Sequence, residues 1–177
     1  MCITPNDKYL FVSHNDGYIK QFSVEKRNLV KDYGKLHEGT VLCMVATKDS
    51  SHIFMSDDKG YVKQLGICEQ KIVNKIIKCH SRAIYSICVT YDKKFLFTSD
   101  DKGNMKQWFI QDLKIVKDFG RIHQGAIYDI VNTYDDDFLF TSDHLGNLKQ
   151  WSISNQGIIK NYGKIHEANI HSMIISN

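Results

Sequence analysis

The chain has 177 residues, 42% of them hydrophobic, with 23 basic and 20 acidic side chains and a formal net charge of +3. This hydrophobic content is enough for a core, and the mixed charge does not indicate a nucleic-acid partner. No stretch approaches the ~18 apolar residues that a membrane span needs, and the start MCITPNDKY lacks a signal-peptide core. We therefore expect a soluble chain with no nucleic-acid or membrane partner.

Cysteine usage indicates the redox compartment. The number of cysteines is odd, no two have the C-x-x-C spacing, and no N-x-[ST] sequon occurs. This pattern is typical of a reducing environment, so we expect a cytoplasmic, intracellular protein. The cysteines are Cys2, Cys43, Cys68, Cys79 and Cys88.

One stretch of sequence recurs four times with a period of 43 residues. Its copies read YLFVSHNDGYIKQF, IFMSDDKGYVKQL, FLFTSDDKGNMKQW and FLFTSDHLGNLKQW. Each copy has an apolar segment, a polar turn with one glycine, and a second segment with Lys-Gln before a bulky residue, which predicts a β-hairpin. The turn glycines are Gly17, Gly60, Gly103 and Gly146, and the bulky residues are Phe22, Leu65, Trp108 and Trp151.

Taken in chain order, the predicted elements are all strands. The first copy is truncated, because residues 1–5 align only with the end of the first strand of a later copy. Its other strands are predicted at 9–15, 18–24 and 30–36. The second copy has predicted strands at 40–47, 52–58, 61–67 and 74–79. The third has them at 83–90, 95–101, 105–110 and 117–122, and the fourth at 126–133, 138–144, 148–153 and 160–165. Residues 169–176 predict one more innermost strand.

A histidine closes each copy fifteen residues after the bulky position. Together with the period, this pattern resembles the WD40 repeat family of β-propellers. The resemblance implies an all-β fold of four-stranded antiparallel blades, four per chain, in a single domain over 1–177. The repeats would span 1–39, 40–82, 83–125 and 126–168, with a closing strand at 169–177. It also implies structural roles for His37, His80, His123, His166, Trp108 and Trp151.

The chain departs from the family pattern at both signature dipeptides. The aspartate expected after the bulky residue is absent from every copy, as is the glycine expected before the histidine. In the family a turn aspartate, a Ser or Thr, the tryptophan and the histidine share a hydrogen-bond network. We hypothesise that Asp57, Asp100 and Asp143, three residues before the turn glycine, supply the missing aspartate.

Four predicted blades do not decide how the ring closes, because propellers close with roughly 4–8 blades. Three arrangements are possible: a four-bladed ring, an eight-bladed ring of two chains, or a fragment of a longer array. We favour the two-chain ring, in which each C-terminal strand completes the first blade of its partner. The chain would then be half of an eight-bladed ring and a homodimer.

No residue pattern indicates catalysis, a cofactor or a metal. Histidines one repeat apart lie in different blades, and no ligand pair has zinc spacing. Cys43 and Cys88 lie in innermost strands, where cysteine is usually a small buried hydrophobe. The aspartates at 135–137 lie in a turn, which suits local hydrogen bonds. We therefore expect no enzyme and no cofactor.

The resemblance implies a protein-interaction scaffold that binds a peptide or protein on the loops around the histidines. The alternative is a structural segment of a larger repeat assembly without a dedicated ligand site. The glutamine of each Lys-Gln pair is expected to make a hydrogen bond between blades. The candidate partner-binding residues are Glu38, Leu42, Arg82, Tyr85, Gln124, Tyr128, Glu167 and His171.

Overall fold

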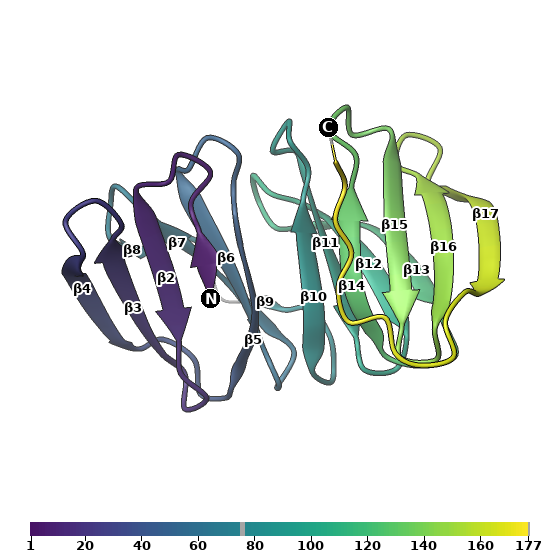
Figure 1. Ribbon diagram of the computed structural model, residues 1–177, viewed down its shortest axis with the longest axis horizontal. Helices are drawn as coiled ribbons and strands as arrows, with labels where there is room; N and C mark the ends of the chain where they lie inside the picture. Colours follow the sequence, from purple (N-terminus) through teal and green to yellow (C-terminus); the bar gives the residue numbers. More distant parts are fainter. Residues whose placement is uncertain (75–76, 177) are drawn as a thin grey trace. The chain divides into compact units, whose positions relative to one another are not determined.

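The computed structural model describes residues 1–74 and 77–176 (Figure 1). Within these residues 17 strands form four sheets, and no helix occurs. The described residues therefore include no helix that is long and apolar enough to span a membrane. The chain divides into two compact units, Met1–Ile84 and Tyr85–Asn177. Each unit is described by itself.

The first unit contains two sheets, which we call the first and second blades. In the first blade the strand order is β1, β2, β3, β4, and these strands are Cys2–Ile3, Tyr9–Ser13, Tyr18–Ser23 and Asn28–Lys35. The second blade is built from β5 (Val41–Ala46), β6 (His52–Asp57) and β7 (Tyr61–Gly66). Two short strands, β8 (Lys71–Ile72) and β9 (Ile77–Lys78), both pair with β7. The predicted strand at 74–79 lies partly outside the described residues, which exclude 75 and 76.

The third and fourth blades make up the second unit. The third blade contains β10 (Ile84–Val89), β11 (Phe95–Asp100), β12 (Asn104–Phe109) and β13 (Ile115–Arg121). The fourth contains β14 (Ile127–Asn132), β15 (Phe138–Asp143), β16 (Asn147–Ser152) and β17 (Gly157–Lys164). The all-β fold of four-stranded antiparallel blades is confirmed, whereas the single domain and the half ring stay predictions.

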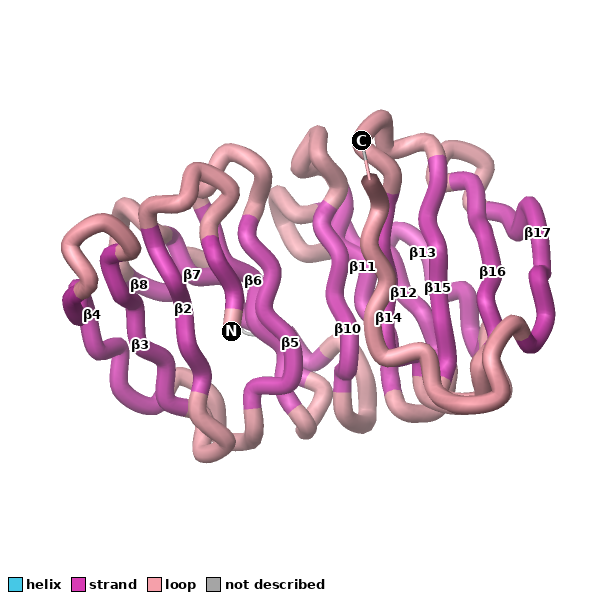
Figure 2. Tube along the Cα trace, viewed as in Figure 1, coloured by secondary structure: helices cyan, strands magenta, loops and turns pink. Residues whose placement is uncertain are grey.

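The first blade is short of an inner strand. Strand β1 pairs only Cys2 with Phe11 and Ile3 with Leu10. The predicted closing strand belongs to no sheet within the described residues, which exclude its last position, Asn177. Figure 2 draws residues 169–176 as a loop that runs beside β14.

Alternation along the strands gives each blade two different faces. In the first unit, Phe11 and Ile19 of the first blade join one buried cluster with Ile53, Met55 and Leu65 of the second. Because neighbouring strand residues point to opposite faces, Val12 and Phe22 lie on the other face of the first blade. We call the face of a blade that carries the repeated bulky residue, such as Phe22, its bulky face. The opposite face, which carries the repeated glutamine, is its glutamine face.

The second unit repeats this packing. Phe97 and Met105, on the glutamine face of the third blade, share a buried cluster with Leu139 and Trp151, on the bulky face of the fourth. A glutamine face therefore packs on the bulky face of the next blade in both units. Each cluster supplies the hydrophobic stabilisation of one blade-to-blade junction.

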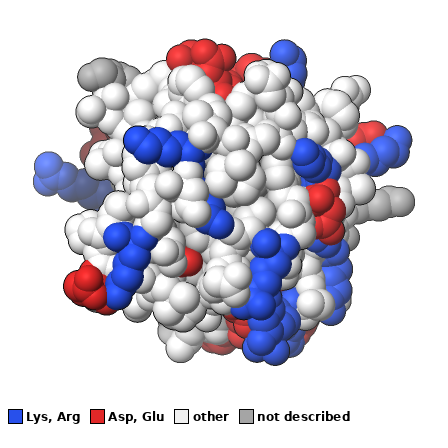
Figure 3. All heavy atoms as spheres, turned by 90° about the vertical axis from the view of Figure 1, so that its right-hand side faces the viewer, with Lys and Arg blue, Asp and Glu red and all other residues white. Residues whose placement is uncertain are grey.

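The glutamine face of the fourth blade is uncovered. Tyr162 is 39% exposed and Ile165 is 46% exposed, although the equivalent Ile122 of the third blade is only 9% exposed. Figure 3 views the side of the second unit that carries β17 and shows broad areas without charged side chains between the lysines. An apolar surface of this kind is typical of an interaction site.

Turn conformation is repeated from blade to blade. The turn glycine Gly103 has φ +84°, and a Cβ there would collide with the main-chain oxygen of His123. Within the described residues, the non-glycine residues with positive φ occupy only two positions of the repeat. They are Asp7, Ser50, Lys93 and Asp136 at one position, and Arg27, Gln70, Leu113 and Gln156 at the other.

The repeated glutamine bonds within its own blade, so the prediction of a bond between blades is wrong. The Tyr33 hydroxyl donates to Gln21 Oε1 at 2.7 Å, and the Tyr162 hydroxyl donates to Gln150 Oε1 at 3.0 Å. Both tyrosines lie on the outer strand of the same blade. Phe119 occupies this position in the third blade, and neither amide atom of the buried Gln107 has a partner within the described structure.

Phe119→Tyr is expected to stabilise the second unit by about 1 kcal/mol, because its hydroxyl would satisfy a buried amide. Urea denaturation of the variant and the parent chain measures this difference. Tyr33→Phe is the matched control and should destabilise the first unit by a similar amount, because it leaves Gln21 without its donor. An unchanged or lower midpoint for Phe119→Tyr would show that the tyrosine hydroxyl contributes nothing at this position.

Candidate interaction surface

A hydrogen-bond network joins the third and fourth blades. His123 lies in the loop after β13, and its Nδ1 is 3.0 Å from Asp143 Oδ2 while its Nε2 is 2.8 Å from the Thr141 hydroxyl. Trp151 Nε1 donates to the same hydroxyl at 3.0 Å. All four side chains are buried. The hypothesis that an aspartate three residues before the turn glycine completes this network is confirmed at Asp143.

The bonds suit a neutral His123 ring. Trp151 Nε1 can only donate, so the Thr141 hydroxyl accepts from it, and the hydroxyl proton is then available to His123 Nε2. Burial lowers the pKa of His123, which favours this neutral ring, with Nδ1 donating to Asp143. Burial alone would raise the pKa of Asp143, but the main-chain and side-chain N–H groups of Asn147 hold it below its usual value.

The network is reduced in the first unit. His37 Nδ1 is 2.9 Å from Asp57 Oδ2, which confirms the same role for Asp57. The other ring nitrogen of His37 has no partner within the described structure, because Met55 and Leu65 replace the threonine and the tryptophan. Both groups of the pair are buried, and this junction also has an apolar cluster and a bond from Lys63 Nζ to the Leu36 main-chain oxygen.

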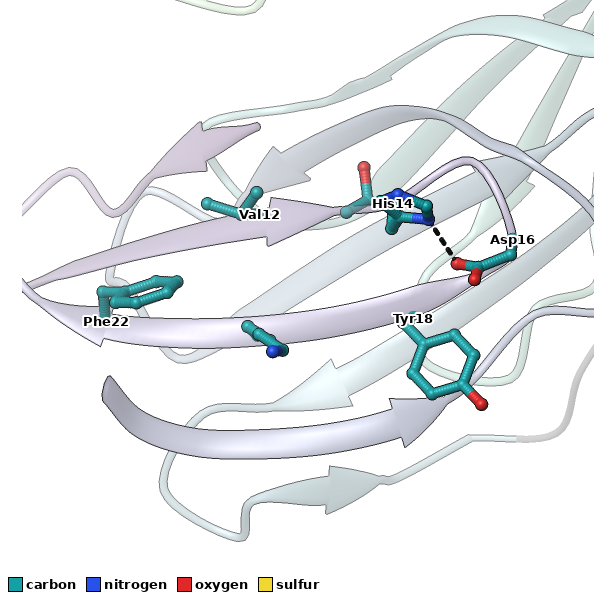
Figure 4. Close-up of a pocket in the computed structure, with 7 residues that line it drawn as sticks. Val12, His14, Asp16, Tyr18 and Phe22 are labelled. Carbon is teal, nitrogen blue, oxygen red and sulfur yellow. Dashed lines mark hydrogen bonds and ion pairs between the residues drawn. The ribbon is translucent and has the colours of Figure 1, made fainter. Parts of the chain in front are cut away.

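The first blade has lost the network completely, and a pocket lies in its place. Val12, Phe22 and His14 occupy the threonine, tryptophan and aspartate positions. They line a cavity of about 380 Å³ on the bulky face with Ser13, Asp16, Tyr18 and Lys20 (Figure 4). His14 Nδ1 is 2.6 Å from Asp16 Oδ1, and both side chains are exposed. The lining is mainly apolar, with its charged groups on the exposed side chains.

Three of the candidate partner-binding residues form a ladder of rings in the second unit. Tyr85 and Tyr128 meet edge to face with their centroids 5.4 Å apart. Tyr128 stacks on His171 at 5.2 Å with an interplanar angle of 8°. The three residues share one phase of the repeat, and Tyr85 is 37% exposed. The structure therefore brings these three together in a partly exposed row, which we call the ring ladder.

The other candidates are mostly exposed side chains near the ends of the outer strands. In the first unit Glu38 pairs with Lys35 at 3.2 Å, which lowers the pKa of the carboxyl group. In the second, Glu167 pairs with Lys164 at 2.7 Å and its pKa is also lowered. Leu42, Arg82 and Gln124 are exposed, and the Gln124 main-chain oxygen accepts a bond from Arg121.

Two residues at the ring ladder were not predicted. His144 lies with its ring centroid 6.2 Å from that of Tyr128. The half-buried Asp129 accepts the main-chain N–H of Met173 at 2.6 Å and so holds residues 169–176 beside β14. Burial raises the pKa of Asp129. The signal for Asp129 was its carboxylate in an otherwise apolar innermost strand, where the other copies have Cys43, Ser86 and Ser172.

The described residues contain no group of three His, Cys, Asp or Glu side chains that could hold a metal ion. Two buried His–Asp bonds, His37–Asp57 and His123–Asp143, each join neighbouring blades. The exposed rings and the uncovered apolar faces are therefore the features of this structure suited to recognition.

Comparison with known proteins matches one stretch of the chain to a family model and its fold to solved structures. Residues 71–108 match the family model of the WD domain, G-beta repeat. The structure of U3-55K is similar with a TM-score of 0.78 and 18% identity, over 89% of this chain and 50% of that one. The RRP9 WD40 repeats match with a TM-score of 0.79 and 18% identity, over 89% and 49%. The chain thus spans about half the length of these structures. No curated protein matches its sequence.

Proposed function

From the WD repeat match of residues 71–108 and the propeller-like blades, we propose that the chain is a WD40-type, non-catalytic scaffold that binds a peptide or protein segment on the ring ladder. The observation that carries the proposal is the continuous contact of Tyr85, Tyr128 and His171 on a partly exposed surface. Tyrosine rings bind partners well because they are large, amphipathic and lose little entropy when ordered. The WD40 fold supports an interaction role, while the fold alone does not identify a partner.

The ladder offers two kinds of contact to a bound segment. Its ring faces suit apolar or guanidinium side chains, because aromatic faces attract cations. Its hydroxyl groups and imidazole suit main-chain groups of an extended segment. Exposed Glu167 lies in the same unit and adds a negative charge at the loop end. We therefore propose that an extended peptide with a basic or aromatic side chain is the preferred ligand.

A peptide library displayed on phage and selected against the 177-residue chain tests this proposal. Tyr128→Ala should weaken the selected peptides at least tenfold in fluorescence polarisation, because it removes the middle ring of the ladder. Tyr134→Ala is the matched control. Tyr134 is 42% exposed and packs on Tyr91 with ring centroids 4.7 Å apart. It lies after the end of β14, whereas Tyr128 lies near the start of this strand.

Equal binding by both alanine variants would place the ligand elsewhere. Failure to select any peptide would contradict a peptide-binding scaffold. Circular dichroism of both variants shows whether they keep the fold, so that a loss of binding can be assigned to the surface. Tyr85→Ala should weaken the same peptides, because Tyr85 contacts Tyr128 directly.

The second candidate function is structural, with the chain as one subunit of a larger ring. The observation that favours it is the uncovered glutamine face of the fourth blade, together with the open bulky face of the first. We propose a homodimer in which two chains form an eight-bladed ring. A head-to-tail contact used twice closes a two-fold assembly.

We also propose a cytoplasmic location, without a nucleic-acid or membrane partner. The support is the cysteine usage: the cysteines, all within the described residues, form no disulfide. Reduced cysteines suit a reducing compartment. Basic and acidic side chains are nearly balanced, which does not favour binding to a polyanion.

A further inference from the structure

Residues 169–176 lie on the fourth blade as an innermost strand lies on the blade before it. The Ser142 hydroxyl donates to the main-chain oxygen of Ile170 at 3.5 Å. Two repeats earlier, the Ser56 hydroxyl donates to the main-chain oxygen of Ile84 at 3.3 Å. Ile84 is the first residue of an innermost strand, β10. The segment therefore has the position of an inner strand that belongs to a following blade.

Two further contacts give the same register. The Met173 N–H donates to Asp129 Oδ2, and one repeat earlier the Ile130 N–H donates to the Ser86 hydroxyl at 3.1 Å. His171 stacks on Tyr128 as Tyr128 meets Tyr85. Three contacts thus repeat at the same phase, although residues 169–176 belong to no sheet within the described structure.

The first blade has a gap that matches this segment. In the fourth blade Ile127 pairs with Asp143, Asp129 with Ser142, and Ile130 with Thr141. In the first blade β1 reaches only Phe11, so the equivalent positions Val12, Ser13 and His14 have no strand on their inner side within the described residues, although β3 pairs on the other side. An open edge of this kind favours pairing with another strand.

We propose that residues 170–173 of a second copy pair antiparallel with Val12–His14 and complete the first blade in trans. The inference rests on the homodimer proposed above and assigns its junction. The repeat register places Ile170 opposite His14, Ser172 opposite Ser13, and Met173 opposite Val12. Phe11 and Leu10 are already paired with β1, so in the dimer the residues after Met173 leave this edge.

The blade faces beside this edge also match. The pocket on the bulky face of the first blade receives the glutamine face of the partner's fourth blade, which presents Phe140, Leu148 and Tyr162. Their equivalents Phe97, Met105 and Phe119 pack on the bulky face of the fourth blade. The pocket thus receives apolar side chains of the same type and position.

A lysine supplies a third match. Lys63 donates from Nζ to the main-chain oxygen of Leu36, and Lys149 donates to that of Ile122, in both cases across a blade junction. Lys20 is at the same phase and lies in the pocket. It pairs with exposed Asp32 at 3.5 Å. In the dimer Lys20 would reach the main-chain oxygen of Ile165 of the second copy.

Light scattering after size exclusion, with the 177-residue chain and a chain that ends at residue 168, is the first test. The full chain should have the mass of two chains and the shortened chain the mass of one. The shortened chain should keep its circular dichroism, because residues 169–176 belong to no sheet of their own chain. A monomeric full chain, or a shortened chain that stays dimeric, would overturn the proposal.

A cysteine pair tests the register. Val12→Cys with Met173→Cys should form a disulfide on oxidation, because directly opposite strand residues bring their Cβ atoms close together. Mixing ¹⁵N-labelled and unlabelled chains before oxidation should give linked peptides with one label of each kind. Met173→Cys alone is the control for bonds to the native cysteines. Linked peptides from a single chain only, or none, would contradict pairing in trans.

The scaffold and the junction can fail separately. Tyr85→Ala removes one ring of the ladder but touches neither the open edge nor the donated segment. It should weaken peptide binding and leave the dimer mass unchanged. A dimer without peptide binding would contradict the scaffold alone, whereas peptide binding by a monomeric full chain would contradict the junction alone.

Discussion

Asp143→Ala is expected to lower the free energy of unfolding of the second unit by about 3 kcal/mol, the cost of breaking a buried pair. Asp143 accepts the main-chain N–H of Leu145 at 3.0 Å and that of Asn147 at 2.9 Å as well as the His123 ring. Alanine would remove the acceptor of all three donors, of which the His123 ring is buried. Urea denaturation followed by tryptophan fluorescence measures the loss, because both tryptophans lie in this unit.

Two variants control this result. Asp143→Asn keeps an acceptor oxygen and should lose less than the alanine variant. Asp112→Ala removes an exposed carboxylate that pairs with Lys114 at 2.9 Å, and should leave the free energy of unfolding nearly unchanged. If Asp143→Ala behaved like Asp112→Ala, the network would not be what joins the third and fourth blades.

Gly103→Ala is expected to cost about 3 kcal/mol. The residue has φ +84°, where a side chain costs roughly 1–2 kcal/mol. An added Cβ would also collide with the His123 main-chain oxygen, and overpacking adds about 1–3 kcal/mol. The Gly103 oxygen accepts the N–H groups of Ile122 and His123, so the collision would disturb the segment that holds the histidine.

Gly120→Ala separates the two contributions. Gly120 also has positive φ, at +65°, but a Cβ there would meet nothing within 4 Å. Its cost should be limited to the backbone strain of about 1–2 kcal/mol. Thermal melts and urea midpoints of the two variants give the difference. Equal losses would mean that the close approach to His123 does not contribute.

The strands and their order could be predicted from the sequence because they depend on local patterns. Alternating apolar residues and one glycine per turn locate the hairpins, and the fixed period orders them into blades. The same phase argument identified Asp57 and Asp143 as partners of histidines, since each stands at one fixed distance from a turn glycine. Local spacing is thus sufficient where the contact repeats.

The contacts that depend on distance between side chains could not be predicted. Alternation placed Gln21 on an inter-blade face, but it could not show that the Tyr33 hydroxyl reaches it first. Spacing identified Tyr85, Tyr128 and His171 as surface candidates without showing that their rings touch. The hydrogen bond from the Met173 N–H to Asp129 likewise depends on the course of a segment that belongs to no sheet of the described structure.

Two turn positions with positive φ carry different residue types in the four copies. An aspartate, a serine and a lysine share one left-handed position, and an arginine, a glutamine and a leucine share the other. Only glycine, and to a smaller degree asparagine and aspartate, favours this conformation by itself. The flanking strands must therefore impose it at the expense of some stability. Residue type can therefore differ at these two positions from copy to copy while the course of the backbone stays the same.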